Sequence, residues 1–273
     1  MYTEYWQLKE KPFELTPNPH YVYFTREHEE ALMRLIYTVR ELKGAMLLTG
    51  LYGCGKTILS RVFLNELRSS RYEVALITNP RLSANDLLRE MIYQLGGEKV
   101  EIESKGDLLH TFNEIVYSNL NMRKQTVIVV DEAQAIEELE TYEELRLLLN
   151  FQQDDRFLIT LILIGQPELR KKLKRIPQLA QRLMIESHLN PLNEKDTSQY
   201  IDHRLNIAGA KQPIFTKEAK NLIYRHSSGT PRIINGLADM ALLEGYLQKK
   251  DSVDLKILKK VVNDAQLEAS WSA

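Results

Sequence analysis

One stretch of eight residues limits what this chain can fold into more than any other. Residues 50–57 read Gly-Leu-Tyr-Gly-Cys-Gly-Lys-Thr, the G-x-x-x-x-G-K-T pattern of a phosphate-binding loop. The apolar run 45–48 before it predicts a buried strand, and the apolar spacing over 58–67 predicts a helix after it. Glycines between a strand and a helix N-terminus let backbone N–H groups surround an anion. The stretch therefore predicts a nucleotide phosphate site.

Each residue type in this loop predicts a role. Lys56 would reach the β- and γ-phosphates, and Thr57 would place its hydroxyl on Mg²⁺. ATP and Mg²⁺ are accordingly the expected cofactors. The residues expected to bind the nucleotide are Gly50, Gly53, Cys54, Gly55, Lys56, Thr57 and Ile58.

Two acids follow the next clearly apolar strand. Residues 126–130 are a threonine and four apolar β-formers, which is typical of a strand buried on both faces, and Asp131 and Glu132 come directly after them. Asp131 suits a metal contact through a bound water, and Glu132 suits the group that orients the attacking water. Carboxylates also end strands simply to face solvent, which is the competing interpretation.

Three more side chains are candidates for catalysis. Gln166 ends a predicted strand over 157–164, where its amide could bond the γ-phosphate or the lytic water, or only form a turn before Pro167. Arg182 could offer its guanidinium to the γ-phosphate of a neighbouring subunit, or form a surface ion pair. Arg232 lies in the first turn of a predicted helix, where a cation opposes the helix dipole. A bound triphosphate nearby would compensate this unfavourable position, which makes Arg232 a candidate phosphate contact.

A basic run over residues 170–175 leaves two interpretations open. The default interpretation is that the run forms a solvated helix face. The alternative interpretation is that it contacts phosphates, either of nucleic acid or of the nucleotide of a neighbouring subunit. The net charge of the whole chain is −1, so no global field draws it to nucleic acid. Any such binding must therefore come from a local patch.

Alternating strands and helices predict an open α/β sheet followed by helices. We expect an N-terminal arm and helix over 1–43, an αβα nucleotide domain over 44–190, a helical domain over 191–268 and a frayed tail over 269–273. The aromatic and proline-rich residues 1–25 predict a packed arm, part of which could line a base pocket. Other elements are predicted at 26–43, 73–78, 83–95, 108–120, 137–152, 194–208, 216–227, 231–248 and 254–266, with a polar loop over 98–106.

Composition narrows the cellular setting. The single cysteine, Cys54, excludes an intrachain disulfide and fits a reducing compartment. The longest apolar run, 157–164, is too short to span a bilayer, and the N-terminus does not read as a secretory signal. These features predict a cytoplasmic protein with no membrane span.

These residues together resemble the AAA+ ATPases, and within them the ExeA/GspA-like group of secretion ATPases. The resemblance is carried by residues 5–24, 79–83, 131–134, 165–169, 177–182 and 229–232, together with the phosphate loop. It implies a P-loop αβα sandwich with a parallel five-stranded sheet and an all-helical lid. It also implies that Gln166 is sensor 1, Arg182 the arginine finger and Arg232 sensor 2; a basic residue in 170–175 is the other choice for the finger.

The resemblance implies an ATP-hydrolysing motor or switch that forms a ring or helical homo-oligomer, expected as a hexamer, with sites between subunits. The group's long members help to assemble a secretion pore, through a membrane span and a peptidoglycan-binding region that we expect this chain to lack. Its partner would be a secretion or pilus component. Similar short ATPases act in transposition and polymerise on duplex DNA, which is the alternative. A slow nucleotide-dependent scaffold is a third hypothesis.

Overall fold

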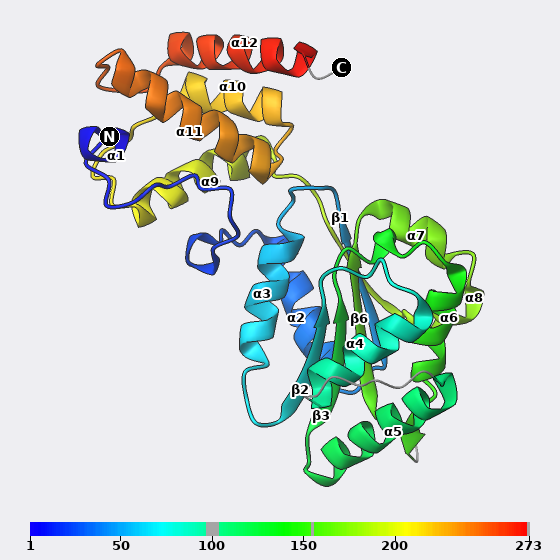
Figure 1. Ribbon diagram of the computed structural model, residues 1–273. Coiled ribbons are helices and arrows are strands. Elements are labelled where there is room, and N and C mark those ends of the chain that lie inside the picture. The colour runs from blue at the N-terminus through cyan, green and yellow to red at the C-terminus, as the bar shows by residue number, and fades with distance from the viewer. Residues whose placement is uncertain (97–103, 154–155, 272–273) are drawn as a thin grey trace. The chain divides into compact units, whose positions relative to one another are not determined.

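The computed structural model describes residues 1–96, 104–153 and 156–271. The chain divides into two compact units (Figure 1). The sheet unit consists of Arg26–Tyr52 and Leu59–Leu189. The helical unit consists of Met1–Thr25, Gly53–Ile58 and Asn190–Ala273. The phosphate loop therefore starts in the first unit and continues in the second.

The sheet unit is built on five parallel strands in the order β2-β3-β6-β1-β7. The strands are β1 (Ala45–Gly50), β2 (Tyr72–Ile77), β3 (Gln125–Val130), β6 (Ile159–Gly165) and β7 (Ile185–Leu189). Every residue of β1 and β6 is buried, as the apolar runs predicted for strands covered on both faces. The predicted P-loop sandwich with a parallel five-stranded sheet is confirmed.

No apolar run predicted β7. Its sequence Ile-Glu-Ser-His-Leu includes three polar residues, and its burial is mixed because it lies at an edge of the sheet, paired with β1 alone. An edge strand of this kind lacks the continuous apolar signature of the central ones. Only the family resemblance implied a fifth strand.

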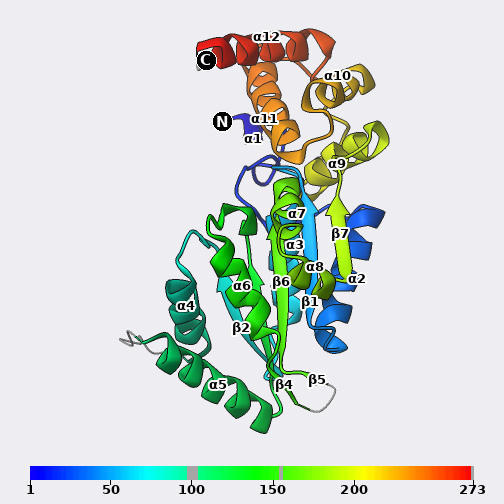
Figure 2. The same cartoon turned by 90° about the vertical axis from the view of Figure 1, so that its right-hand side faces the viewer.

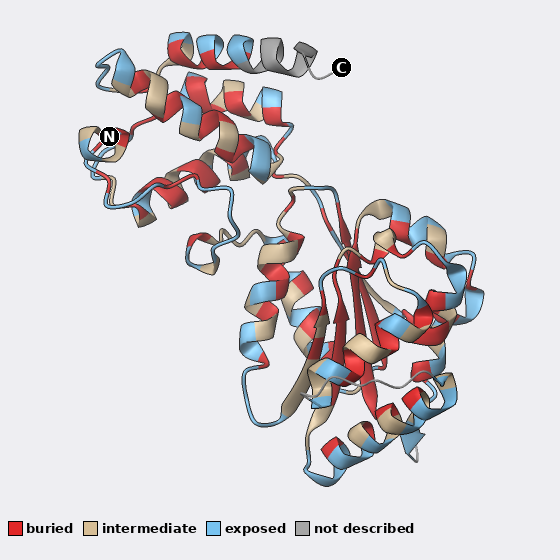
Figure 3. Ribbon diagram, viewed as in Figure 1, coloured by how far each residue is buried: buried red, intermediate tan, exposed pale blue. Residues whose placement is uncertain are grey.

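Helices cover both faces of this sheet (Figure 2). Helix α2 (Arg26–Arg40) packs on β1 and β7, whereas α4 (Ala84–Gly96) packs on β2 and α5 (Lys105–Asn121) on β3. The core on the α4 and α5 side also takes residues from α6 (Leu139–Leu148), α7 (Pro167–Leu173) and α8 (Pro177–Arg182). Figure 3 shows the strands as the most continuously buried part of this unit.

Several boundaries differ from the prediction. Helix α6 is shorter than residues 137–152, and Leu139 is 43% exposed at its first helical position. After α6 the chain forms a small antiparallel hairpin, β4 (Gln152–Gln153) and β5 (Arg156–Phe157), so β6 starts two residues later than predicted. Most of the polar loop predicted at 98–106 lies outside the described residues.

The helical unit contains α9 (Glu194–Ile207), α10 (Lys217–Ser227), α11 (Pro231–Leu247) and α12 (Leu255–Trp271), close to the predicted ranges. The helix α12 continues to Trp271, and the last two residues of the predicted frayed tail lie outside the described part of the chain. Asn193 and Thr216 begin α9 and α10 as side-chain caps.

The N-terminal arm packs into this helical unit. It contains a short helix α1 (Tyr2–Tyr5) and a 3₁₀ turn η1 (Pro19–Tyr21), where the sequence predicted neither. Trp6 donates its indole N–H to the Leu242 carbonyl at 2.9 Å, and the Arg204 guanidinium lies 4.8 Å from the Tyr21 ring. Burial of these rings confirms the predicted packed arm.

Candidate active site

The candidate residues of the sheet unit are brought together by strand direction. Because all five strands are parallel, their carboxyl ends lie at one edge, which we call the carboxyl edge. Gly50 ends β1, Asp131 follows β3 and Gln166 follows β6. β6 pairs with both β1 and β3, so these three residues end adjacent strands. In open α/β sheets, ligands bind outside this edge.

The glycines of the phosphate loop are required by its geometry. Gly53 and Gly55 have φ angles of +81° and +95°, in the left-handed region that favours glycine. A Cβ at Gly50 would lie 2.9 Å from the carbonyl oxygen of Leu189 in β7. Helix α3 (Lys56–Glu66) begins directly after the loop, as predicted. The local structure is therefore strand, glycine loop and helix N-terminus.

Two loop side chains are buried. Lys56 is 4% exposed at the first position of α3, and Cys54 is 1% exposed. A cation at a helix N-terminus opposes the dipole, so a buried lysine there is typical of a site built for an anion. Thr57 and Ile58 follow in the first helical turn.

Within the helical unit, Gly53 lies against the start of α11. A Cβ at Gly53 would lie 2.9 Å from the Cβ of Arg232 and 3.1 Å from Cγ2 of Thr230. Thr230 occupies the N-cap position of α11 (Pro231–Leu247), but its side chain makes no capping hydrogen bond. The structure thus brings Arg232 to the phosphate loop, although the two are 179 residues apart in sequence (232 minus 53).

The two acids after β3 differ in setting. Asp131 is 6% exposed, its N–H donates to the Ile77 carbonyl at 2.8 Å, and its Oδ1 accepts the N–H of Glu132 at 2.8 Å. Glu132 is half-buried and has φ +51°, ψ +34°, a left-handed conformation that is strained for a side chain with a Cβ. The carboxylate of Glu132 accepts a hydrogen bond from Nε2 of Gln134.

Gln134 also contacts the neighbouring strand end. Its Oε1 accepts the backbone N–H of Gln166 at 3.0 Å. Gln166 stands at the N-cap position of α7, and its side chain does not cap that helix. Reasoning from sequence assigned no role to Gln134; the available signal was an amide two residues after the candidate glutamate.

Arg182 lies at the opposite edge of the sheet, where the strands begin, which we call the amino edge. Its guanidinium donates to the Leu149 carbonyl at 2.9 Å and to Oδ1 of Asn150 at 2.8 Å, and lies 6.0 Å from the Phe157 ring. That ring is within 3.1 Å of a Cβ built at Gly44, just before β1. Six-residue strands at about 3.3 Å per residue separate the two edges by roughly 20 Å.

The basic run 170–175 is not simply a solvated helix face. Arg170 forms an ion pair with Glu186. Lys172 donates from Nζ to the carbonyl oxygens of Gln134 at 2.7 Å and Ile136 at 2.6 Å. The exposed positions of Arg170, Lys171, Lys174 and Arg175 agree with the default interpretation, whereas the half-buried Lys172, which is bonded to two carbonyls, departs from it.

The carboxylates fit a magnesium ion that is shared with a nucleotide. Among the described residues, no group of three His, Cys, Asp or Glu side chains could hold a metal. Mg²⁺ is usually bound by one or two carboxylates plus phosphate oxygens and waters. In the sheet unit, the buried Asp131 carboxylate is a group that suits such an ion.

A parallel sheet of this strand order, with a glycine loop from its first strand into a helix, defines a P-loop NTPase. A family model for an AAA domain matches residues 39–173. General secretion pathway protein A of Aeromonas hydrophila is 37% identical over 281 aligned residues, which cover 100% of this chain and 50% of that protein. The AAA domain match and the full-length similarity to this relative are together consistent with an AAA ATPase of the general secretion pathway protein A group. The chain spans about half the length of that relative.

Solved structures agree with the fold. Cdc6p from Pyrobaculum aerophilum has a TM-score of 0.70 at 15% identity, covering 92% of this chain and 70% of that one. The ORC1 protein of Aeropyrum pernix, solved in complex with DNA, has a TM-score of 0.69 at 17% identity, covering 94% and 69%. No helix in the described ranges is both long and apolar enough to cross a membrane.

Proposed function

We propose that this protein binds ATP with Mg²⁺ and hydrolyses it, as an AAA+ motor or switch that acts in a homo-oligomer. The observation that carries the proposal is the carboxyl edge, where the phosphate loop begins one strand away from β6 and two strands away from β3 with its acids. Phosphoryl transfer needs a phosphate cradle, a metal carboxylate and a group that orients water. The sequence and this edge supply all three kinds of group.

Each residue then has a task. Lys56 and the loop amides bind the phosphates, and Glu132 orients and deprotonates the attacking water. Gln166 holds the γ-phosphate or that water, and Arg232 stabilises phosphate charge from the start of α11. The ion held by Asp131 and Thr57 would supply charge neutralisation on the β- and γ-oxygens.

The position of Arg182 supports an oligomer. Roughly 20 Å of sheet separates the amino edge from the carboxyl edge of the same unit, so Arg182 cannot serve its own triphosphate. A neighbouring subunit that presents its phosphate loop to this edge would receive the guanidinium. We propose a ring or helical assembly of this kind, with a hexamer as the expected form.

The partner we propose is a component of a secretion or pilus assembly system. Support comes from the name of the relative, general secretion pathway protein A, which matches this chain along its whole length.

ATPase rate and particle mass, measured together across protein concentration with and without duplex DNA, test this proposal. A rate that rises with concentration and mass, and that DNA does not alter, is the expected result. A chain that binds no ATP, or binds it without any turnover at every concentration, would refute the proposal.

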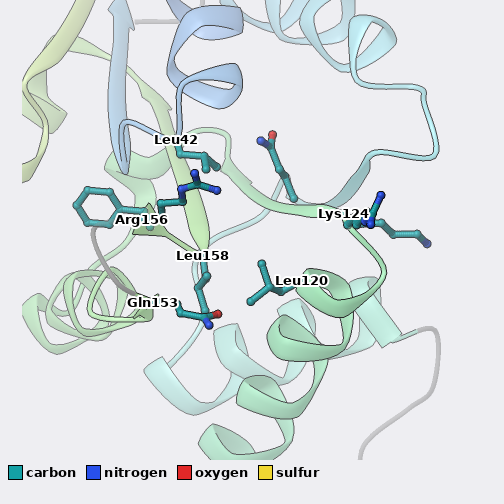
Figure 4. A pocket seen from close by; sticks show the side chains of 9 residues that line it. Leu42, Leu120, Lys124, Gln153, Arg156 and Leu158 are labelled. Atoms are coloured by element: carbon teal, nitrogen blue, oxygen red, sulfur yellow. The ribbon is translucent and has the colours of Figure 1, made fainter.

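A second candidate function, ATP-controlled growth on duplex DNA as in transposition, is favoured by a basic groove at the amino edge. One cavity of about 600 Å³ has three cations in its lining, Arg123, Lys124 and Arg156, and Lys124 is paired with the carboxylate of Glu73 (Figure 4). An adjoining cavity of about 760 Å³ shares Arg123 and adds Arg40 and Arg71, with Glu66 as its acid. Phosphate backbones bind to such rows of cations.

The groove, rather than the run 170–175, is where this second candidate should be tested. Arg123→Ala should weaken duplex binding and reduce the slope of log affinity against log salt by about 1. Arg175→Ala, an exposed arginine of the run, is the matched control and should leave the slope unchanged. Equal effects of both substitutions, or no binding of DNA by the wild type, would remove this candidate.

A further inference from the structure

Gln134 uses both ends of its amide to join the candidate catalytic glutamate to the next strand. Nε2 donates to the Glu132 carboxylate, and Oε1 accepts the N–H of Gln166. If the Gln134 amide were flipped, its oxygen would face the Glu132 carboxylate and its NH₂ group would face the Gln166 N–H. Both contacts would be repulsive, so these two partners determine the orientation of the amide. The half-buried side chain therefore spans from the end of β3 to the end of β6.

The surroundings hold this amide in place from three sides. A Cβ at Gly165 would lie 2.6 Å from Oε1 of Gln134, so the glycine leaves the space that the amide oxygen occupies. The carbonyl of Gln134 accepts Nζ of Lys172 from α7 at 2.7 Å. The Tyr142 hydroxyl donates to the Ala133 carbonyl at 2.7 Å. The turn that carries Gln134 is thus bonded to α6, α7 and the end of β6.

Glu132 depends on such support, because its left-handed backbone conformation is strained and persists only where neighbours hold it. The backbone bond to Asp131 holds its main chain, and the Gln134 amide holds its carboxylate. One carboxylate oxygen is bound in this way, and the amide hydrogen bond orients the other.

We propose that Gln134 is a positioning residue for hydrolysis: it orients the Glu132 carboxylate toward water and couples that carboxylate to Gln166. The inference rests on the proposed ATPase activity. A shift of the Gln166 backbone when the γ-phosphate is bound or lost would pass through one amide to the group that activates water. Gln134 itself touches no reacting atom.

Two isosteric substitutions separate the two bonds. Gln134→Glu keeps an acceptor for the Gln166 N–H but replaces the donor to Glu132 by a second carboxylate. Gln134→Met removes both bonds at similar volume. Both variants should lower kcat on the order of 10- to 100-fold, the usual effect of losing an outer-shell partner, with KM and nucleotide affinity within about twofold. Thermal unfolding should stay close to that of the wild type for Gln134→Glu.

Gln248→Ala is the matched control, because Gln248 makes the same kind of amide-to-carboxylate bond, to Glu244, on the surface of α11. It should keep wild-type kcat. A normal kcat in Gln134→Glu would overturn the inference, since the bond to Glu132 would then be dispensable; a raised kcat would also overturn it and would make Gln134 a restraint. An inactive wild type would instead refute the proposed function.

Discussion

The two edges of the sheet carry opposite chemistry. The carboxyl edge has glycine, two carboxylates and an amide, with Asp131 buried. At the amino edge a lysine or arginine stands within three residues before every strand, namely Lys43, Arg71, Lys124, Arg156 and Arg182. The first edge carries the groups that we propose bind a metal and phosphates, whereas the second carries mainly basic residues. This difference is the basis of the proposal that Arg182 at the amino edge serves the nucleotide of a neighbouring subunit.

Lys56→Ala gives the largest expected effect and tests the carboxyl edge first. Without the ammonium, ATP binding and turnover should fall below detection, because the proposed role of this buried cation is to bind the phosphates. Binding is measured by equilibrium titration with a fluorescent ATP analogue. The surface variant Lys260→Ala is the control, because Lys260 is an exposed lysine that forms an ion pair with Glu244 within the helical unit. Tight ATP binding by Lys56→Ala would contradict the phosphate-loop assignment.

Arg182→Ala tests whether the amino edge serves a neighbour. Turnover should fall on the order of 10³-fold, the effect of losing an arginine finger, while ATP binding persists. Mixing Arg182→Ala with Lys56→Ala chains should restore activity, because one chain binds ATP and the other supplies the arginine.

Mixing the two variants shows whether a low ATPase rate in Arg182→Ala comes from the loss of a finger that acts between subunits. Failure of complementation, with both variants folded and assembled, would rule out a finger acting between subunits. Arg175→Ala, which tests the basic run as the other source of a finger, should keep wild-type turnover. If it instead loses activity while Arg182→Ala does not, the finger lies in the run 170–175.

Glu132→Gln sharpens the contrast within the carboxyl edge. Loss of the base should lower turnover on the order of 10²- to 10³-fold, yet leave ATP bound and the oligomer trapped. Single-turnover kinetics and particle mass with ATP measure the two effects. Wild-type turnover in this variant would contradict the assignment of Glu132 as the group that activates water.

Gly53→Ala should have a moderate effect. The new Cβ would lie 2.9 Å from the Cβ of Arg232, and the φ of +81° costs about 1–2 kcal/mol for alanine. We expect ATP affinity to fall about tenfold, measured by titration, since 1.4 kcal/mol is a factor of ten. Gly236→Ala in α11 is the matched control: nothing lies within 4 Å of its new Cβ, and affinity should not change.

Ser83→Ala should have the smallest effect, and on stability alone. Its hydroxyl caps α4 by accepting the N–H of Asp86 at 3.2 Å, and losing such a cap costs about 1 kcal/mol of unfolding free energy. The same hydroxyl donates to the Asp86 carboxylate, which with Arg89 holds the pKa of Asp86 below its usual value.

The pH dependence follows from the sign of that shift. A lowered folded-state pKa contributes stability above the unfolded pKa, and this contribution is lost as the pH falls through the folded value. The stability gap between wild type and Ser83→Ala should therefore narrow in acid, as denaturant titration at neutral and acidic pH would show. Ser83 has no proposed role in catalysis, so its substitution should leave the ATPase rate unchanged. A lower ATPase rate in Ser83→Ala would contradict this expectation.

The central strands and the longer helices were predictable from sequence because their apolar spacing is local, whereas the short helices α1, α7 and α8 were not among the predicted elements. The phosphate loop was predictable for the same reason: the glycines that allow its backbone conformation and the lysine that supplies its charge all lie within eight consecutive residues. Edge strand β7 and the hairpin β4–β5 escaped prediction, since their stability comes from pairing with other segments rather than from their own pattern.

The sequence by itself determined the kinds of chemistry: a phosphate cradle at residues 50–57, two acids after an apolar strand, and arginines at 182 and 232. The tertiary structure decided which of them meet. Parallel pairing of β3 and β6 brings Gln134 to Gln166, and the same strand direction sends Arg182 to the opposite edge. A hydrogen bond depends on positions in space that no spacing along the chain encodes, and so these relations appear only once the sheet is formed.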